Sequence, residues 1–135
     1  MKKTNYPAVK MKQGCAKRVK AGSPWVFSNE IDMTPETKNL PAGTLVRLFE
    51  ANDTFIGVGS FNPHSLISFR KMAGDPQTEI DAAFFAKRLR RSVALRDALI
   101  NSPFYRLVHS EGDGLPGLII DRFDDIIACQ LNTAG

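Results

Sequence analysis

The stretch from Arg18 to Ile31 reads RVKAGSPWVFSNEI and combines a basic helical turn, a break and an apolar strand. Proline cannot continue a helix and restricts the residue before it, so Gly22-Ser23-Pro24 ends the helical turn predicted for residues 14–20. Trp25-Val26-Phe27 then resumes as an apolar strand. A short helix enclosed by strands favours a small, strand-rich domain at the start of the chain.

The residues around this stretch are rich in strand-forming side chains. Asn52-Asp53 favours a tight turn, so the runs on either side of it are predicted to form a hairpin. Gly57 and Gly59 share one face of the second hairpin strand, where they indicate either tight curvature, the favoured interpretation, or close approach of a ligand. Short strands at this spacing predict a small β-barrel, and the runs concerned are residues 8–11, 43–50, 55–61 and 65–70.

A change of pattern at residues 72–78 predicts a second segment that opens with a long helix. Thr78 followed by Asp81 has the spacing of a capping box, and Asn101 and Pro103 end the helix. Apolar residues at helical spacing predict the buried face: Ala82, Phe85, Leu89, Val93 and Ile100. Basic residues are predicted on the opposite side: Lys87, Arg90 and Arg91.

Three strands are predicted after this helix, at residues 105–109, 118–122 and 126–131. Asp113-Gly114-Leu115-Pro116-Gly117 has the residue types of a turn. Residues 126–129 are apolar on both faces, so we expect this strand to be covered on both sides. Too little sequence follows to supply that cover, so the second segment is interpreted as incomplete. The predicted fold class is α+β, a small β-barrel followed by an incomplete α+β domain.

The charge distribution indicates an acidic partner such as nucleic acid. The net charge is +4, and no acidic residue precedes Glu30. A simply solvated surface is the alternative for such charge runs. The positive residues before Glu30 are Lys2, Lys3, Lys10, Lys12, Lys17, Arg18 and Lys20, and a second cluster contains Lys87, Arg88, Arg90 and Arg91.

Aromatic side chains add a second indication of nucleic-acid binding, because unpaired bases stack on them. The candidates for stacking are Trp25, Phe27, Phe61 and Phe69. Phe61 and Phe69 lie in strand-like runs together with Phe49, and all three are predicted to be core residues. Trp25 is the single tryptophan. Packing is the favoured interpretation for it, since tryptophan is mostly buried on average, and base stacking is the alternative.

Several classes of site find little support in the sequence. Cys15 and Cys129 lie far apart without metal-ligand spacing, and both fit a reduced cytoplasmic protein. No signal peptide, membrane span or nucleotide-binding glycine loop is found. A metal site is disfavoured because the spacing of the nearest candidates matches no ligand pattern; these are His109, Glu111, Asp113 and Asp121. We assign no catalytic, cofactor-binding or metal-binding residue.

Four motifs carry a family resemblance: RVKAGSPWVFSNEI at 18–31, GVGSFNPHSLISFRKM at 57–72, AAFFAKRLRRSVALRDAL at 82–99 and EGDGLPGLIIDRFDD at 111–125. In this order they resemble the N-terminal part of bacterial class I SAM-dependent 23S rRNA (cytosine-5) methyltransferases. The family often has histidine before the proline of the first motif, where this chain has Ser23.

The resemblance implies a PUA domain, a small RNA-binding pseudo-barrel, at residues 1–73. It implies the first portion of a central α+β domain at 74–135, without the Rossmann-like domain that binds S-adenosyl-L-methionine (SAM). In that family a cysteine attacks C6 of a flipped-out cytosine, and neither Cys15 nor Cys129 matches its context. This chain is therefore not expected to be active alone.

The expected function is to recruit and orient rRNA for cytosine-C5 methylation, with SAM as the cofactor of the full-length protein. The alternative is a structural module with little RNA affinity, which forms a homodimer through exposed strand edges. No membrane partner is expected. The RNA-binding residues predicted from charge, aromaticity and the resemblance are Lys10, Lys12, Lys17, Arg18, Lys20, Trp25 and Arg70.

Overall fold

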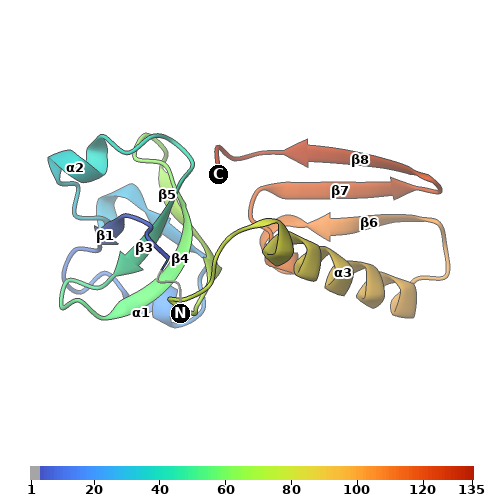
Figure 1. The fold of residues 1–135 in the computed structure, drawn as a ribbon, viewed down its shortest axis with the longest axis horizontal. Helices are drawn as coiled ribbons and strands as arrows, with labels where there is room; N and C mark the ends of the chain where they lie inside the picture. Colours follow the sequence, from blue (N-terminus) through green and yellow to red (C-terminus); the bar gives the residue numbers. More distant parts are fainter. Residues whose placement is uncertain (1–3) are drawn as a thin grey trace. The chain divides into compact units, whose positions relative to one another are not determined.

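The computed structural model describes residues 4–135, so Lys2 and Lys3 lie outside the described residues. The chain divides into two compact units (Figure 1). We call the part up to Thr78, which also takes in residues 134–135, the barrel unit, and Glu79–Thr133 the sheet–helix unit.

The barrel unit contains five strands and three short helical segments. The strands are β1 (Ala8–Lys10), β2 (Trp25–Phe27), β3 (Thr44–Phe49), β4 (Phe55–Phe61) and β5 (Ile67–Ala73). The helical segments are α1 (Lys17–Lys20), the 3₁₀ turn η1 (Ser28–Glu30) and α2 (Pro35–Lys38).

The five strands form one sheet in the order β1-β3-β4-β5-β2. β1 runs parallel to β3, and every other pair is antiparallel. The predicted hairpin is confirmed as β3–β4, and Asp53 at its turn has a φ of 67°, a left-handed conformation that Asp tolerates. β5 begins and ends later than the predicted 65–70, because Asn62–Ser65 forms a turn before it.

Backbone hydrogen bonds also join the two edges of this sheet. Met11, directly after β1, forms an antiparallel bridge with Ile31, directly after η1. The Lys12 N–H donates to the Glu30 carbonyl at 2.8 Å, and the Asp32 N–H donates to the Lys10 carbonyl at 2.9 Å. The sheet therefore curls toward closure, in agreement with the predicted small barrel.

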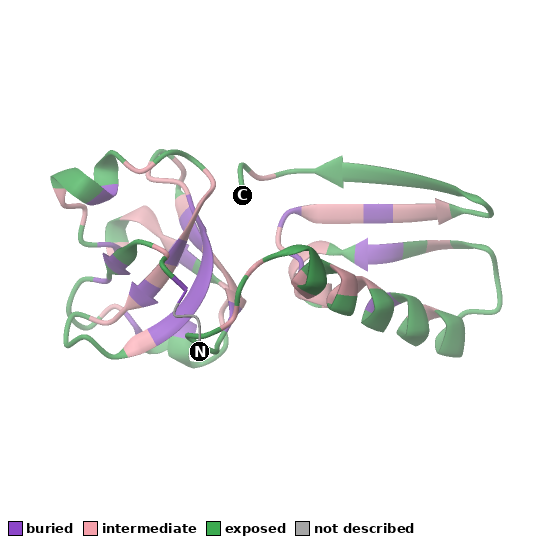
Figure 2. Ribbon diagram, in the orientation of Figure 1, coloured by how far each residue is buried: buried purple, intermediate pink, exposed green. Residues whose placement is uncertain are grey.

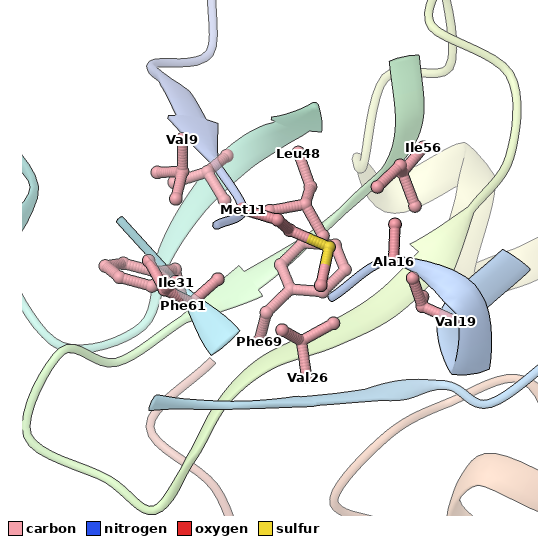
Figure 3. Packing of buried hydrophobic residues seen from close by; sticks show 11 residues of the cluster. Val9, Met11, Ala16, Val19, Val26, Ile31, Leu48, Ile56, Phe61 and Phe69 are labelled. Carbon is pink, nitrogen blue, oxygen red and sulfur yellow. The ribbon is translucent and has the colours of Figure 1, made fainter. Parts of the chain in front are cut away.

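The core of the barrel unit lies inside this curled sheet (Figure 3). Phe61 and Phe69, predicted as core residues, are 1% and 0% exposed, whereas Phe49, predicted with them, is only partly buried. β4 is the most deeply buried strand (Figure 2). Burial of one such side chain contributes about 1.5–3 kcal/mol relative to its exposure. The other members of the cluster are Val9, Met11, Ala16, Val19, Val26, Ile31, Val46, Leu48 and Ile56.

The glycines of β4 lie where another backbone comes close. A Cβ atom on Gly59 would overlap the Arg70 carbonyl oxygen and lie 2.9 Å from Cε2 of Phe69. A Cβ on Gly57 would lie 2.9 Å from the Ala73 carbonyl oxygen. β5 therefore occupies the space beside these glycines, which favours the structural interpretation over approach of a ligand.

The sheet–helix unit consists of one long helix followed by a three-stranded antiparallel sheet. Its elements are α3 (Ala82–Leu99), β6 (Phe104–His109), the 3₁₀ turn η2 (Ser110–Asp113), β7 (Leu118–Phe123) and β8 (Ile126–Leu131), and the strand order is β6-β7-β8. A small core contains Leu107, Val108, Leu115 and Ile120, against which Leu89, Tyr105 and Leu118 pack. The predicted α+β fold class is confirmed.

The cap predicted for the long helix is wrong. The helix begins at Ala82, and Asp81 is itself the N-cap, its carboxylate accepting the Phe84 N–H at 2.9 Å. Thr78 instead lies in a turn that follows Asp75. The helix also ends at Leu99, because Ile100 has an extended conformation. An aspartate three residues after a threonine fits a capping box with Thr78 as the N-cap, and it fits equally a helix whose N-cap is Asp81. Spacing alone does not distinguish the two.

The buried face predicted for this helix is also largely wrong. Phe85, Val93 and Ile100 are 36–38% exposed, whereas Ser92 is only 3% exposed. Arg96 and Arg88 share the covered side, because η2 and Gly114 supply acceptors for both guanidinium groups. Lys87, Arg90 and Arg91 are exposed as predicted.

The cover expected for the last strand is not found among the described residues. All six residues of β8 are exposed, with exposed fractions of 64% at Ile126, 58% at Ile127 and 79% at Leu131. Figure 2 shows the strand as exposed along its length. α3 packs on β6, at the other edge of the three-stranded sheet.

Candidate nucleic-acid interface

The short helix α1 presents three basic side chains on the surface of the barrel unit. Val19 is 3% exposed and anchors the helix in the core, together with Ala16 at its N-cap. Lys17, Arg18 and Lys20 are exposed as a result. The helix ends at Lys20 with Ala21 as its C-cap, and Gly22 follows with a φ of 113°, a conformation that favours glycine.

Three of the predicted RNA-binding residues form ion pairs within the barrel unit. Arg18 pairs with Glu30, Lys20 with Glu50 and Lys10 with Asp53, each with a nitrogen–oxygen distance of 2.7 Å. The basic side chains are about half exposed in every pair. Only the Lys10–Asp53 pair is exposed on both sides, and exposed pairs contribute little to stability, so a phosphate group could compete with Asp53. The carboxylates of Glu30 and Glu50 are 19% and 18% exposed.

Lys12 and Lys17 differ from these three residues, because neither forms an ion pair within residues 4–135. Both are exposed. Lys12 also lines an open hollow of about 250 Å³, formed by the loop before α1 and the β3–β4 turn. The other residues around the hollow are Gln13, Gly14, Ala16, Glu50, Ala51 and Asn52.

Trp25 and Arg70 lie on neighbouring strands. They are direct partners in the β2–β5 pair, and the Arg70 guanidinium lies 5.6 Å from the centre of the Trp25 ring. Trp25 is 37% exposed, so the interpretation of this residue as part of the core is wrong. Its position on an edge strand and on the outer face explains the difference: Val26, which points inward, is only 1% exposed.

Phe27 continues this outer face of β2. The Arg18 guanidinium lies 4.5 Å from the centre of the Phe27 ring. One oxygen of Glu30 accepts both from Arg18 at 2.7 Å and from the Phe27 N–H at 3.0 Å. We call the set Trp25, Phe27, Arg18 and Arg70 the β2 aromatic strip.

The sheet–helix unit carries a second basic surface, on α3. Arg88, part of the predicted basic cluster, turns inward and donates to the Gly114 carbonyl. Burial lowers the pKa of Arg88, and the neighbouring charge of Arg91 lowers it further. The exposed members of the cluster are therefore Lys87, Arg90 and Arg91.

The acidic side chains near His109 are engaged by arginines. Asp113 accepts two hydrogen bonds from Arg96, both at 2.8 Å, and a third from the His109 N–H at 2.7 Å. Asp121 pairs with Arg106 at 2.8 Å, and hydrogen bonding to that guanidinium lowers the pKa of Asp121. Across residues 4–135, no three His, Cys, Asp or Glu side chains gather as metal ligands would.

Sequence reasoning did not identify the acidic partners of the basic surface. Glu30, Glu50 and Asp53 come from η1, the end of β3 and the following turn, and only the folded barrel brings them to the basic side chains. No local spacing signals these contacts. No helix of the described residues is long and apolar enough to cross a membrane.

Comparison with known sequences identifies proteins that are similar to this chain. Residues 9–73 match a family model described as a PUA-like domain. The chain is 38% identical over 130 residues to "Ribosomal RNA large subunit methyltransferase I" of Shewanella frigidimarina, covering 94% of this chain and 32% of that protein. It is 36% identical over 131 residues to the protein of the same name from Aliivibrio fischeri, covering 95% and 33%.

Solved structures show the same fold. A Streptococcus mutans protein described as a SAM-dependent methyltransferase has a TM-score of 0.77 at 19% identity, covering 94% of this chain and 33% of its own. A protein described as a methyltransferase, solved with S-adenosylhomocysteine, has a TM-score of 0.75 at 20% identity, covering 94% and 32%. The chain spans about a third of the length of the curated relatives it matches. Residues 9–73 are therefore similar to PUA-like domains, and the chain is similar to part of the proteins named ribosomal RNA large subunit methyltransferase I.

Proposed function

We propose that this chain is the RNA-binding region of an rRNA large-subunit methyltransferase, and that it recruits and orients rRNA for methylation at C5 of a cytosine. The observation that carries the proposal is the exposed basic surface around α1 of the PUA-like domain, where Lys12 and Lys17 form no ion pair within residues 4–135. The relatives' names, which specify rRNA, support the choice of partner. Phosphate contacts by lysines position an RNA without reading its sequence.

In this proposal residues 1–73 bind RNA, and residues 74–135 are the first portion of a central domain. The residues of this chain do not fit SAM, because they include no glycine-rich loop between a strand and a helix. SAM binding and catalysis are assigned to parts of the relatives' length that this chain does not span, and the proposed location is the cytoplasm.

The seven predicted RNA-binding residues contribute in different ways in this proposal. Lys12 and Lys17 supply phosphate contacts directly. Lys10, Arg18 and Lys20 would have to exchange a carboxylate for a phosphate. Trp25 and Arg70 belong to the β2 aromatic strip. We therefore expect Lys12 and Lys17 to account for most of the salt dependence of binding.

Lys12→Glu and Lys17→Glu should each weaken binding to a labelled rRNA fragment roughly fivefold to tenfold at low salt, since each removes a phosphate contact. Each should also reduce the slope of log affinity against log salt by about 0.7–0.9. Fluorescence anisotropy at several salt concentrations measures both quantities. Arg18 is a poorer target, because it packs on Phe27 as well as carrying charge.

Lys38→Glu is the matched control, because it makes the same charge change at an exposed position on α2, outside the predicted set. It should alter affinity much less than either test variant. Equal losses of RNA affinity in all three variants would show that only the net charge of the chain matters. That result would contradict the proposal that RNA binds a defined surface around α1. Absence of RNA binding by the unaltered chain would contradict the proposed function itself.

A homodimerisation module is the second candidate function, and the exposure of β8 favours it. The strand lies at the edge of its sheet and carries no charge or proline along Ile126–Leu131. Edges without such protection pair with other strands. Ile127→Lys should therefore abolish any concentration-dependent dimer seen by analytical ultracentrifugation. Leu66→Lys, at a 72% exposed position in the barrel unit, is the control. A monomer at all concentrations would exclude this candidate.

A further inference from the structure

We propose that the β2 aromatic strip binds unpaired nucleotides of the RNA, with one base stacked on Trp25. This inference rests on the proposed RNA-binding function and narrows it: the barrel unit would prefer a single-stranded segment or a loop over a continuous duplex. Base stacking on exposed aromatic rings tolerates any sequence, because every base has a π face.

The position of the strip makes it accessible. β2 is an edge strand, so one of its sides faces no other strand within the sheet. Trp25 and Phe27 lie on the outer face of β2, on either side of the buried Val26. A register shift between Val26 and Phe27 marks a local irregularity in the strand. Trp25 is consequently 37% exposed, although tryptophan is usually well buried.

Each ring of the strip is accompanied by an arginine. Arg70 lies over Trp25 at 5.6 Å, and Arg18 lies over Phe27 at 4.5 Å. The bond from Arg18 to Glu30 holds that guanidinium in place, and Glu30 also accepts the Phe27 N–H. Guanidinium planes are themselves stacking surfaces for bases and attract phosphates. The strip thus offers π surfaces and positive charge together, a combination typical of single-strand binding sites.

The spacing of the strip argues against a duplex. Residues two apart in a strand are about 6.7 Å apart, roughly twice the spacing of about 3.4 Å between consecutive stacked nucleotides along one strand of double-helical DNA. Consecutive bases of a continuous stack therefore cannot use both Trp25 and the Arg18–Phe27 pair. Nucleotides splayed away from each other can do so. A duplex also hides its base faces, which the side chains of the strip could then not reach.

Trp25 is the only tryptophan of the chain, so its fluorescence reports this site without a label. Titration with an unstructured oligoribonucleotide should quench that fluorescence as a base stacks on the ring. A hairpin of the same length and composition with a short closed loop should quench less and bind more weakly. Anisotropy of fluorescently labelled versions of both RNAs measures binding independently of the tryptophan signal.

Trp25→Ala should weaken binding of the single-stranded RNA about 5- to 150-fold, the range found for loss of one stacked base, and Trp25→Phe should restore much of that affinity. Phe104→Ala, at a 62% exposed aromatic of the sheet–helix unit, is the matched control and should change little. Far-UV circular dichroism verifies that each variant is folded. This inference would be overturned if RNA bound without quenching the fluorescence of Trp25 and if Trp25→Ala bound that RNA with unchanged affinity. The proposed function would then still stand. No RNA binding in the anisotropy experiment would overturn both.

Discussion

Gly59→Ala is expected to destabilise the barrel unit by about 3 kcal/mol or more. An added Cβ would overlap the Arg70 carbonyl oxygen, lie 2.8 Å from the Arg70 carbonyl carbon and lie 2.9 Å from Phe69. The first two atoms are backbone of β5, so no side-chain rotation relieves the overlap. Phe69 is 0% exposed and cannot move outward without opening the core. The strands β4 and β5 would have to separate at the centre of the sheet.

Urea unfolding followed by Trp25 fluorescence measures this loss, because the single tryptophan lies in the barrel unit. Gly74→Ala is the matched control: its Cβ would meet nothing closer than the Lys71 side chain at 3.9 Å. That variant should change the free energy of unfolding by no more than about 0.5 kcal/mol. Equal effects of the two substitutions would show that Gly59 is not placed by the close approach of β5.

Gly59 also links the fold to the candidate site. The residue that its Cβ would displace, Arg70, lies over the ring of Trp25. A shift of β5 would therefore disturb the β2 aromatic strip as well as the core. Reduced RNA binding by a Gly59 variant would reflect this displacement, and so it would not identify Gly59 as a contact residue.

The strands of the barrel unit could be predicted because their signals are local. The Asn52-Asp53 turn, the break at Pro24 and the apolar run Trp25–Phe27 each act within a few residues. The parallel pairing of β1 with β3 and the Met11–Ile31 bridge have no such signal. Both depend on segments distant in sequence that meet only when the core of the barrel forms.

The sequence predicted which types of residue make up the candidate nucleic-acid interface better than it predicted how these residues contact one another. The concentration of lysine and arginine before Glu30 correctly indicated an exposed basic surface. It could not distinguish Lys17 from Lys20, because the carboxylate that pairs with Lys20 comes from the end of β3. The exposure of Trp25 likewise follows from the place of β2 at the sheet edge. In α3, Arg88 and Arg96 face inward because Gly114 and Asp113 satisfy them, a tertiary effect that overrides helical periodicity.

Asp113→Asn is expected to destabilise the sheet–helix unit by about 2–3 kcal/mol. The carboxylate of Asp113 is 8% exposed and accepts two bonds from Arg96, whose side chain is 16% exposed. It also accepts the His109 N–H, which fixes the end of β6 against η2. The substitution leaves a largely buried guanidinium without a counter-charge. Hydrogen-exchange mass spectrometry of peptides from residues 104–123 measures the loss within this unit.

The pH dependence of this effect gives an independent test. Burial alone raises the pKa of Asp113, but the hydrogen bonds from Arg96 and the His109 N–H, with the Arg96 charge, lower it below its usual value. A lowered pKa in the folded state means that the carboxylate stabilises the unit above about pH 4, and that this contribution is lost as the pH falls below that value. The difference between the unaltered chain and Asp113→Asn should therefore be largest near neutral pH and shrink under acid conditions. Asp121→Asn breaks an exposed aspartate–arginine pair of the same unit and is the control. If its effect on exchange equals that of Asp113→Asn, burial of the Arg96–Asp113 pair does not explain the stability of η2.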